Sequence, residues 1–185
     1  MLPYLISPFQ SSFVLGRQII DDVVVMQEVL HLMRSKSGVK GWMAIKQDLG
    51  KAYDCLWWEF IQDTLSKKKI PAHLIGVTMH CISSCSLNIL WNGEPTGSFS
   101  STRGIRQGDL LSPYLFVACM ETLSQLIESK CKAGRWKGVP VSKGGLRISH
   151  LMFAYDVVLF GEVIRIKRGL YKRVYMSFVR HQGRS

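Results

Sequence analysis

Two apolar segments near the C-terminal end of the chain meet at a tyrosine and an aspartate. Residues 148–155 and 157–160 are both apolar runs of strand length, and they meet at Tyr155 and Asp156. The pattern predicts a tight hairpin of two antiparallel strands. Aspartate is among the commonest turn residues, so Asp156 has an ordinary structural explanation when it is taken alone.

The rest of the chain alternates between helical and extended patterns. Residues 42–48 predict a strand that ends in Asp48, with Met43 and Ile45 on one face. Apolar residues recur every three or four positions in the first expected helix. The expected helices cover residues 18–35, 56–68, 72–84 and 112–134. A further hairpin is expected around Asn92-Gly93, and Ser112 is expected to cap the last helix. This order of elements predicts an α+β fold with an antiparallel sheet.

Composition limits the class of protein. The chain has 185 residues, 47% of them apolar, which suits one domain with a hydrophobic core. No apolar run reaches the length of a membrane helix, and the first residues lack the features of a secretory signal, so we expect a protein that neither spans a membrane nor is secreted. Five cysteines without metal-site spacing predict reduced, buried thiols.

Positive charge is concentrated at the C-terminal end. The net charge is +11, and residues 163–185 contribute seven Lys and Arg and no acid. The first 162 residues therefore hold 17 basic and 13 acidic residues, a net charge of only +4. The break in composition predicts a boundary near Val163.

Three segments interrupt apolar elements with polar residues or glycine: QDLGKAYD (47–54), RGIRQGDLLSPYLF (103–116) and FAYDVVLF (153–160). Each also has a structural explanation. Asp48 could be a helix N-cap, the glycine-rich loop could be a turn before a helix, and Asp156 could be a turn residue.

Together, in order and spacing, these segments resemble the palm motifs of reverse transcriptases. They are most similar to those of plant non-LTR (LINE-type) retrotransposons, which carry patterns like IDLEKAYD, RGIRQGDPLSPYLF and FADDLILF. The upstream stretch SPFQSSFVLGRQIIDD is similar to the family's SPNQSSFVPGRQI-type fingers segment, and the resemblance covers roughly residues 4–162. It implies a polymerase palm, an antiparallel sheet with packed helices, plus part of the fingers and no thumb.

The resemblance also implies a division of the chain. Residues 1–45 would be a partial fingers segment, residues 46–162 the palm, and residues 163–185 an unassigned basic tail. The family's endonuclease and further fingers upstream, and its thumb downstream, lie beyond the part that the resemblance covers.

The resemblance gives roles to individual residues. Asp48 and Asp156 would be catalytic ligands of Mg²⁺, because phosphoryl transfer by two divalent ions requires converging carboxylates. Tyr53 would lie beneath the incoming sugar. The nucleotide and template side would be lined by Arg106, Gln107 and Gly108. The implied partners are an RNA template, a DNA primer and deoxynucleotides, with no membrane, in the nucleus or cytoplasm.

The sequence departs from the family pattern at the hairpin. Where the family has two adjacent aspartates, this chain has Tyr155-Asp156, and the flanking residues allow no shift that recovers the missing acid. A phenol is neutral at pH 7 and is a poor Mg²⁺ ligand. We therefore expect an impaired reverse transcriptase fragment.

Three further departures are smaller. Gln47 replaces an apolar residue on the Met43 and Ile45 face, and Leu15 and Leu110 replace prolines of the pattern.

Two alternatives remain open at this point. The chain could be a noncatalytic nucleic-acid-binding remnant that uses Lys51, Arg103, Arg106 and the basic tail against phosphates. It could also be a translation product that folds poorly. The sequence predicts no oligomeric state.

Overall fold

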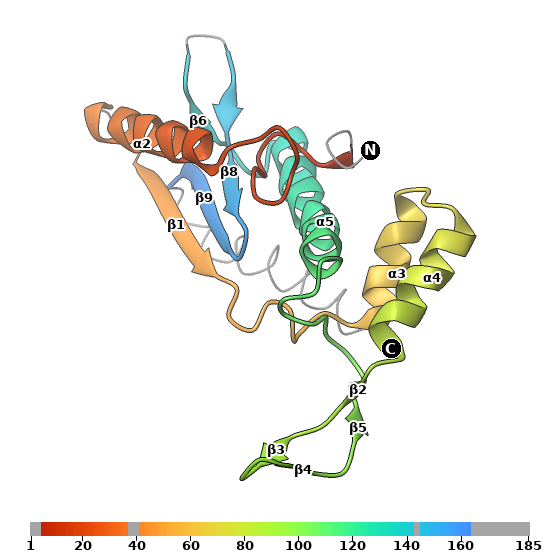
Figure 1. The fold of residues 1–185 in the computed structure, drawn as a ribbon. Helices are drawn as coiled ribbons and strands as arrows, with labels where there is room; N and C mark the ends of the chain where they lie inside the picture. The colour runs from red at the N-terminus through yellow and green to blue at the C-terminus, as the bar shows by residue number, and fades with distance from the viewer. Residues whose placement is uncertain (1–4, 37–40, 143–144, 164–185) are drawn as a thin grey trace.

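A three-stranded antiparallel sheet with helices on both faces forms the centre of the molecule (Figure 1). The computed structural model describes residues 5–36, 41–142 and 145–163. The sheet has the order β1-β9-β8, in which β1 is Trp42–Asp48, β8 is His150–Phe153 and β9 is Asp156–Glu162. The expected α+β class is confirmed, since antiparallel strands and packed helices share one core.

The helices fall into two groups. One face of the sheet packs against α2, which is Ile19–Ser35. The other face packs against α5, Ser112–Lys132, and beyond it α3, Trp58–Lys67. Helix α4, which is Ala72–Ser83, packs against α3. Each helix lies within two residues of its sequence-predicted bounds.

Alternation along the strands explains why both faces of the sheet are apolar. Met152, Val157 and Leu159 belong to the large cluster with α5, whereas Leu151 and Val158 belong to the cluster with α2. Sheets covered on both faces are near-continuously apolar in their central strands. The apolar runs on either side of Tyr155-Asp156 therefore become β8 and the central strand β9.

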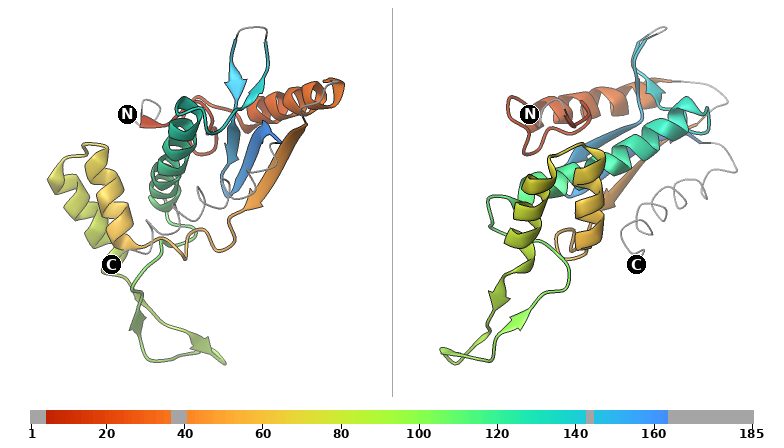
Figure 2. Two further views of the ribbon diagram at one scale, coloured as in Figure 1. Left: turned by 180° about the vertical axis from the view of Figure 1, so that it is seen from behind. Right: turned by 90° about the vertical axis from the view of Figure 1, so that its right-hand side faces the viewer.

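Small two-stranded ladders complete the fold. The expected hairpin at Asn92-Gly93 is present, as an inner pair of strands and an outer pair: β3 Leu90–Trp91 with β4 Glu94–Pro95, and β2 Ser86–Leu87 with β5 Phe99–Ser100. It projects away from the sheet and helices (Figure 2). The strands β6, Val139–Pro140, and β7, Arg147–Ile148, form the other small ladder.

A buried hydrogen-bonded chain ties the N-terminal segment to α5 and the sheet. His150 Nε2 shares a 2.8 Å hydrogen bond with Ser124 Oγ, which shares one of 2.9 Å with Ser7 Oγ. On its other side, His150 Nδ1 and Ser149 Oγ are 2.9 Å apart. Burial lowers the pKa of His150 to about 3, so the ring is neutral at physiological pH.

Two sequence predictions are wrong at the level of local structure. Ser112 does not cap α5: its buried hydroxyl has no hydrogen-bond partner among the described residues, and Asp109 Oδ1 instead accepts a hydrogen bond from Leu111 N at 2.9 Å. All five cysteines are free thiols as expected, but Cys55 and Cys81 are exposed and only Cys119 is fully buried.

The basic tail, apart from Val163, lies outside the described residues. Among the residues that the structure does describe, no helix is both long and apolar enough to cross a membrane.

Candidate active site

The two carboxylates that the resemblance assigns to the metal site lie opposite each other on neighbouring strands. Asp48 is the last residue of β1, Asp156 is the first of β9, and the antiparallel register pairs them directly. Directly opposed residues have Cβ atoms about 5 Å apart and share one face of the sheet. Asp48 is therefore not a helix N-cap, because a turn rather than a helix follows it.

The strand pairing continues into the connecting loops. Leu49 N donates a 3.0 Å hydrogen bond to the carbonyl oxygen of Tyr155. This bond fixes the chain just past Asp48 to the turn just before Asp156. The backbone thereby holds both aspartates at the same end of the sheet.

A lysine already neutralises one of the two carboxylates. Lys46 Nζ lies 3.0 Å from Asp156 Oδ2. Lys46 stands two residues before Asp48 on β1, so strand alternation places it on the same face as both aspartates. The pair is exposed, with the lysine side chain 66% accessible to solvent, and such pairs are weak and screened by salt.

Tyr155 takes part in an aromatic cluster. It belongs to the turn between β8 and β9, where Ala154 has a φ of 48°. Its ring is 5.4 Å from that of Tyr53, edge to face, and 5.5 Å from that of Phe116. Tyr53 and Phe116 are themselves 5.2 Å apart. We call these three residues the aromatic triad; Tyr155, at 43% exposure, is its outer member.

Tyr53 is, with Phe116, one of the two buried members of the triad. Its hydroxyl is buried without a hydrogen-bond partner among the described residues. Burial raises the pKa of Tyr53 well above the ordinary tyrosine value, and the neighbouring Tyr155 phenol raises it further. The ring is therefore a neutral, largely buried group rather than an acid.

The glycine-rich loop is docked on the segment that follows β1. Gly104 N donates to Leu56 O at 2.7 Å, Ile105 N to Tyr53 O at 3.1 Å, and Trp58 Nε1 to Gly104 O at 2.8 Å. Gly104 has a φ of 89°, and a Cβ there would meet Asp54 Cα at 3.2 Å. Glycine thus permits the close backbone approach that joins this loop to Tyr53.

The remaining site residues from the sequence lie on the exposed rim of that loop. Arg106 Nη2 lies 3.1 Å from Asp109 Oδ2. Gln107 and Gly108 are exposed, and Gly108 has a φ of 85° with open space around a hypothetical Cβ. The structure thus brings Asp48, Asp156, Tyr155 and Tyr53 together through direct pairing or ring contact, and shows no direct contact from Arg106, Gln107 or Gly108 to them.

Three side chains at the site escaped the sequence reasoning: Lys46, Asp109 and Phe116. The period of two along residues 42–48 could have revealed Lys46, because it falls on the face of Asp48. Phe116 is an apolar residue of the helix at 112–134, and no local pattern indicates its contact with Tyr155. Asp109 lies within the quoted motif, but only the fold shows its bonds to Arg106 and Leu111.

The donor set does not fit a two-ion magnesium site. No group of three or more His, Cys, Asp or Glu side chains that could hold a metal ion occurs within residues 5–36, 41–142 and 145–163. The two opposed carboxylates are what the site offers, and one of them is paired with Lys46. Mg²⁺ requires several hard oxygen ligands in near-octahedral geometry.

The smaller departures from the family pattern lie in exposed or half-buried places. Gln47 is half-buried, and its Nε2 donates a 2.8 Å hydrogen bond to Asp48 O. Leu15 and Leu110 are each 89% exposed. These leucines direct apolar side chains into solvent at the two positions where the pattern has proline.

Comparisons with known proteins bear on the family of the chain and on its fold. Residues 2–177 match the family model described as reverse transcriptase (RNA-dependent DNA polymerase). An uncharacterized mitochondrial protein of Arabidopsis thaliana is 51% identical over 65 residues, covering 35% of this chain and 53% of that protein. A Pol polyprotein from a retrotransposable element R2 of Nasonia vitripennis is 25% identical over 153 residues, covering 83% of this chain and 14% of the polyprotein.

The fold has similar solved structures. A telomerase from Candida tropicalis, solved in complex with a fragment of telomeric RNA, superposes with a TM-score of 0.63 at 11% identity, covering 90% of this chain and 28% of that one. At this identity the likeness shows a shared fold. The chain spans about half of the Arabidopsis protein and a much smaller part of the polyprotein and the telomerase. Since the family model matches nearly all of its residues, the chain belongs to the reverse transcriptase family of RNA-dependent DNA polymerases.

Proposed function

We propose that this reverse transcriptase domain of a non-LTR retroelement is catalytically impaired because Tyr155 stands in place of a hairpin carboxylate. The observation that carries the proposal is the position of the Tyr155 ring. It packs on Tyr53 and Phe116, and Tyr155 directly precedes Asp156, the strand partner of Asp48.

Charge counting gives the physical reason. Three carboxylates would bring a formal charge of about −3 to the metal site, two bring −2, and the Lys46 ammonium on Asp156 reduces this to about −1. A divalent ion must therefore displace the lysine and bind with too few oxygen ligands. The site cannot hold two ions in the arrangement that in-line phosphoryl transfer requires.

The nucleotide and template roles are part of the same proposal. In the family arrangement Tyr53 would lie beneath the incoming sugar, and Arg106, Gln107 and Gly108 would face the nucleotide and the template. An RNA template, a DNA primer and deoxynucleotides are the proposed partners. The hydrogen bond from Ile105 N to Tyr53 O supports this grouping, because it couples the glycine-rich loop to Tyr53. The division into residues 1–45, 46–162 and 163–185 also remains a proposal.

Primer extension on poly(rA)/oligo(dT) with Mg²⁺ or Mn²⁺ tests the proposal. We expect no metal-dependent product from the chain itself. Extension that Asp48→Ala abolishes would contradict the impairment.

Mn²⁺ titration followed by electron paramagnetic resonance tests the cause directly. We expect Tyr155→Asp to bind Mn²⁺ at least tenfold more tightly than the parent, because it restores an oxygen ligand. Tyr155→Phe is the matched control: it removes the hydroxyl without adding a carboxylate, so its Mn²⁺ affinity should equal that of the parent. Equal affinity in Tyr155→Asp would show that this position lies outside the metal site.

A noncatalytic nucleic-acid-binding remnant is the second candidate. The Arg103 guanidinium lies over the Trp57 ring at 5.3 Å, and Arg106 is exposed nearby in sequence. Binding of RNA that weakens steeply with salt, without synthesis in any of the variants above, would favour this function.

A further inference from the structure

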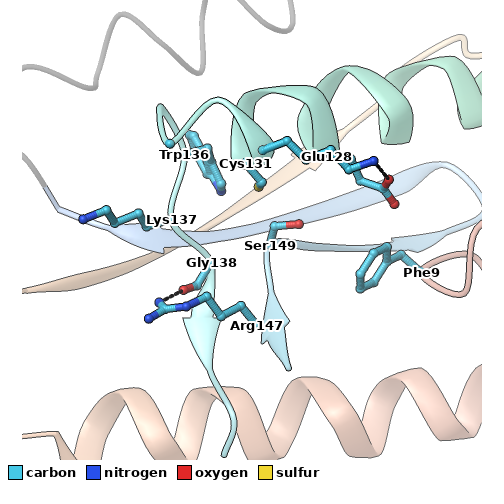
Figure 3. A pocket seen from close by; sticks show the side chains of 10 residues that line it. Phe9, Glu128, Cys131, Trp136, Lys137, Gly138, Arg147 and Ser149 are labelled. Carbon is cyan, nitrogen blue, oxygen red and sulfur yellow. Dashed lines mark hydrogen bonds and ion pairs between the residues drawn. The ribbon is translucent and has the colours of Figure 1, made fainter. Parts of the chain in front are cut away.

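Figure 3 shows a pocket of about 490 Å³. It lies toward the end of the sheet opposite the two aspartates, as its contact with β9 shows. Its residues come from the C-terminal end of α5, the loop from Gly134 to Gly138, strand β7, and the segment around Phe9. Ser149, in its wall, accepts a hydrogen bond from Phe160 N through its carbonyl oxygen. Phe160 lies four residues beyond Asp156 on β9, or about 13 Å along the strand. The pocket is thus distinct from the candidate active site.

One end of the pocket is cationic. Lys137 and Arg147 lie together on one side, and Phe9 and Glu128 lie on the other (Figure 3). The ion pairs described for residues 5–36, 41–142 and 145–163 join side chains other than Lys137 and Arg147. Arg147 Nη1 donates to Gly138 O at 3.1 Å, which anchors the guanidinium while leaving further donors on the same fork.

The carboxylate that lines the pocket, Glu128, already has a cationic partner. Glu128 Oε2 lies 3.9 Å from Lys132 Nζ, one helical turn away. The pocket's charged side chains are three cations and one carboxylate, a net charge of +2. The last carbonyl groups of α5 accept hydrogen bonds from the following loop, as Lys130 O does from Arg135 N and Trp136 N. The helix end therefore presents few free carbonyl oxygens to repel an anion.

The other walls are apolar, with one oriented hydroxyl. Phe9, Cys131 and Trp136 line the pocket, and Trp136 is held by a 2.9 Å hydrogen bond from Nε1 to Phe160 O. Ser149 Oγ is positioned by His150 Nδ1 at 2.9 Å. Because His150 and Ser124 form the buried chain described above, this hydroxyl is linked to the buried core.

We propose that this pocket binds a nucleotide, with its phosphate at Lys137 and Arg147 and its base against the apolar wall at Phe9 and Cys131. Lysine and arginine side chains bind phosphate through charge-assisted hydrogen bonds, and bases contact aromatic side chains through their flat faces. The volume lies in the range of small-molecule sites. The same chemistry is offered by a free nucleotide and by an unpaired nucleotide of a strand.

Binding of adenosine monophosphate, measured by calorimetry in EDTA, tests the proposal. We expect it to bind at least tenfold more tightly than inorganic phosphate, because phosphate makes no use of the apolar wall. Lys137→Gln/Arg147→Gln should weaken binding about a hundredfold, at about tenfold for each of the two charged contacts that it removes. Lys67→Gln, which removes an exposed cation outside the pocket, is the matched control and should leave binding unchanged.

A second variant keeps the test decisive if the double substitution impairs folding. Cys131→Phe fills the pocket without changing its charge and should also abolish binding of adenosine monophosphate. Equal affinities for the nucleotide and for phosphate, or unchanged binding in both pocket variants, would overturn the proposal. Asp48→Ala should leave this binding unaltered, so the outcome is separable from that of the active-site proposal.

A single-stranded oligo(dA) of twelve residues distinguishes the two sources. Tighter binding of the oligonucleotide than of the monophosphate, lost in Lys137→Gln/Arg147→Gln, identifies the ligand as part of a strand. Binding of the monophosphate alone identifies a free nucleotide. An oligonucleotide and a monophosphate that both fail to bind would contradict the site itself.

Discussion

At the scale of residues, the candidate site is defined by the side chains that surround Asp48 and Asp156. Asp48 and Asp156 retain their opposed places, yet the neighbouring groups are a phenol in an aromatic triad and an ammonium on a carboxylate. Local pattern predicts the strand that carries Asp48, and the family resemblance identifies the missing acid. Neither shows that Tyr155 packs on Phe116, because that contact joins positions far apart in the sequence.

The Lys46 to Asp156 ion pair gives a prediction at this scale. Lys46→Gln should increase Mn²⁺ affinity severalfold, because it frees Asp156 Oδ2. Unfolding free energy should change by less than about 1 kcal/mol, as for exposed ion pairs generally. Chemical denaturation and Mn²⁺ titration measure the two effects. Lys67→Gln, which breaks the exposed pair with Asp63 on α3, is the control and should leave Mn²⁺ affinity unchanged.

His150 gives a pH dependence. Its folded pKa of about 3 lies below the ordinary value of 6.5, so the unfolded chain binds a proton first as pH falls. The stability contributed by neutral His150 is complete above about pH 6.5 and is lost as pH falls toward 3. The expected loss is on the order of a few kcal/mol.

Urea denaturation at pH 7, 5 and 4 measures this loss. His150→Gln keeps a polar side chain beside Ser124 and cannot titrate, so its stability should fall less than that of the parent over the same range. Carboxylates common to both proteins cancel in the comparison. Parallel curves for the two proteins would show that His150 does not titrate as stated.

At the scale of elements, glycines show where backbone approach decides the packing. A Cβ on Gly138 would lie 2.6 Å from Ile148 O and 2.9 Å from Ser149 N. Both contacts are backbone atoms of the segment that pairs with β6, so a side chain there must push two strands apart. Gly76, inside α4, has open space around a hypothetical Cβ.

These two glycines predict opposite effects of one substitution. Gly138→Ala should lower the free energy of unfolding by about 1 to 3 kcal/mol through overpacking. Gly76→Ala should raise it by about 0.5 to 1 kcal/mol, because alanine is the better residue in a helix interior. Thermal and urea denaturation of the two variants measures the difference. Two changes of the same sign would contradict the packing described for β6 and β7.

Element prediction from sequence succeeds here where the pattern is local. The strand at residues 42–48 has the predicted bounds, because alternating side chains and a terminal carboxylate define it without distant partners. The predicted cap of α5 is wrong. Ser112 and Asp109 are both residue types that can accept hydrogen bonds at the start of a helix, and the path of the loop decides which of them does so. The sequence carries no local signal for the pairing of β1 with β9, because these are the first and the last of the described strands along the chain.

At the scale of the whole molecule, the projecting hairpin exposes an apolar surface. Ile89, Leu90, Trp91 and Phe99 are all exposed, and Trp91 reaches 72%. Trp91 pairs with Glu94 in the inner strands and is absent from the hydrophobic clusters described above. The hairpin is therefore peripheral to the core.

Trp91→Ser should accordingly change the melting temperature by no more than about a degree, because the Trp91 side chain buries little apolar surface in the folded protein. It should reduce concentration-dependent self-association, since exposed apolar patches promote contact between molecules. Differential scanning calorimetry and analytical ultracentrifugation at several concentrations test both expectations. Val157→Ser is the contrasting variant: it lies in the core at 2% exposure and should lower stability by at least about 2 kcal/mol.

The register of the central sheet also sets an order of events during synthesis. Asp48 pairs with Asp156, so 108 residues must leave the ribosome before the last position of β1 meets its neighbour. At ordinary elongation rates of about 5 to 20 residues per second, this takes about 5 to 20 s. Because β9 is the middle strand, its arrival joins β1 and β8 to one sheet for the first time. Until then the nascent polypeptide carries an unpaired strand, the state in which chaperones are most needed.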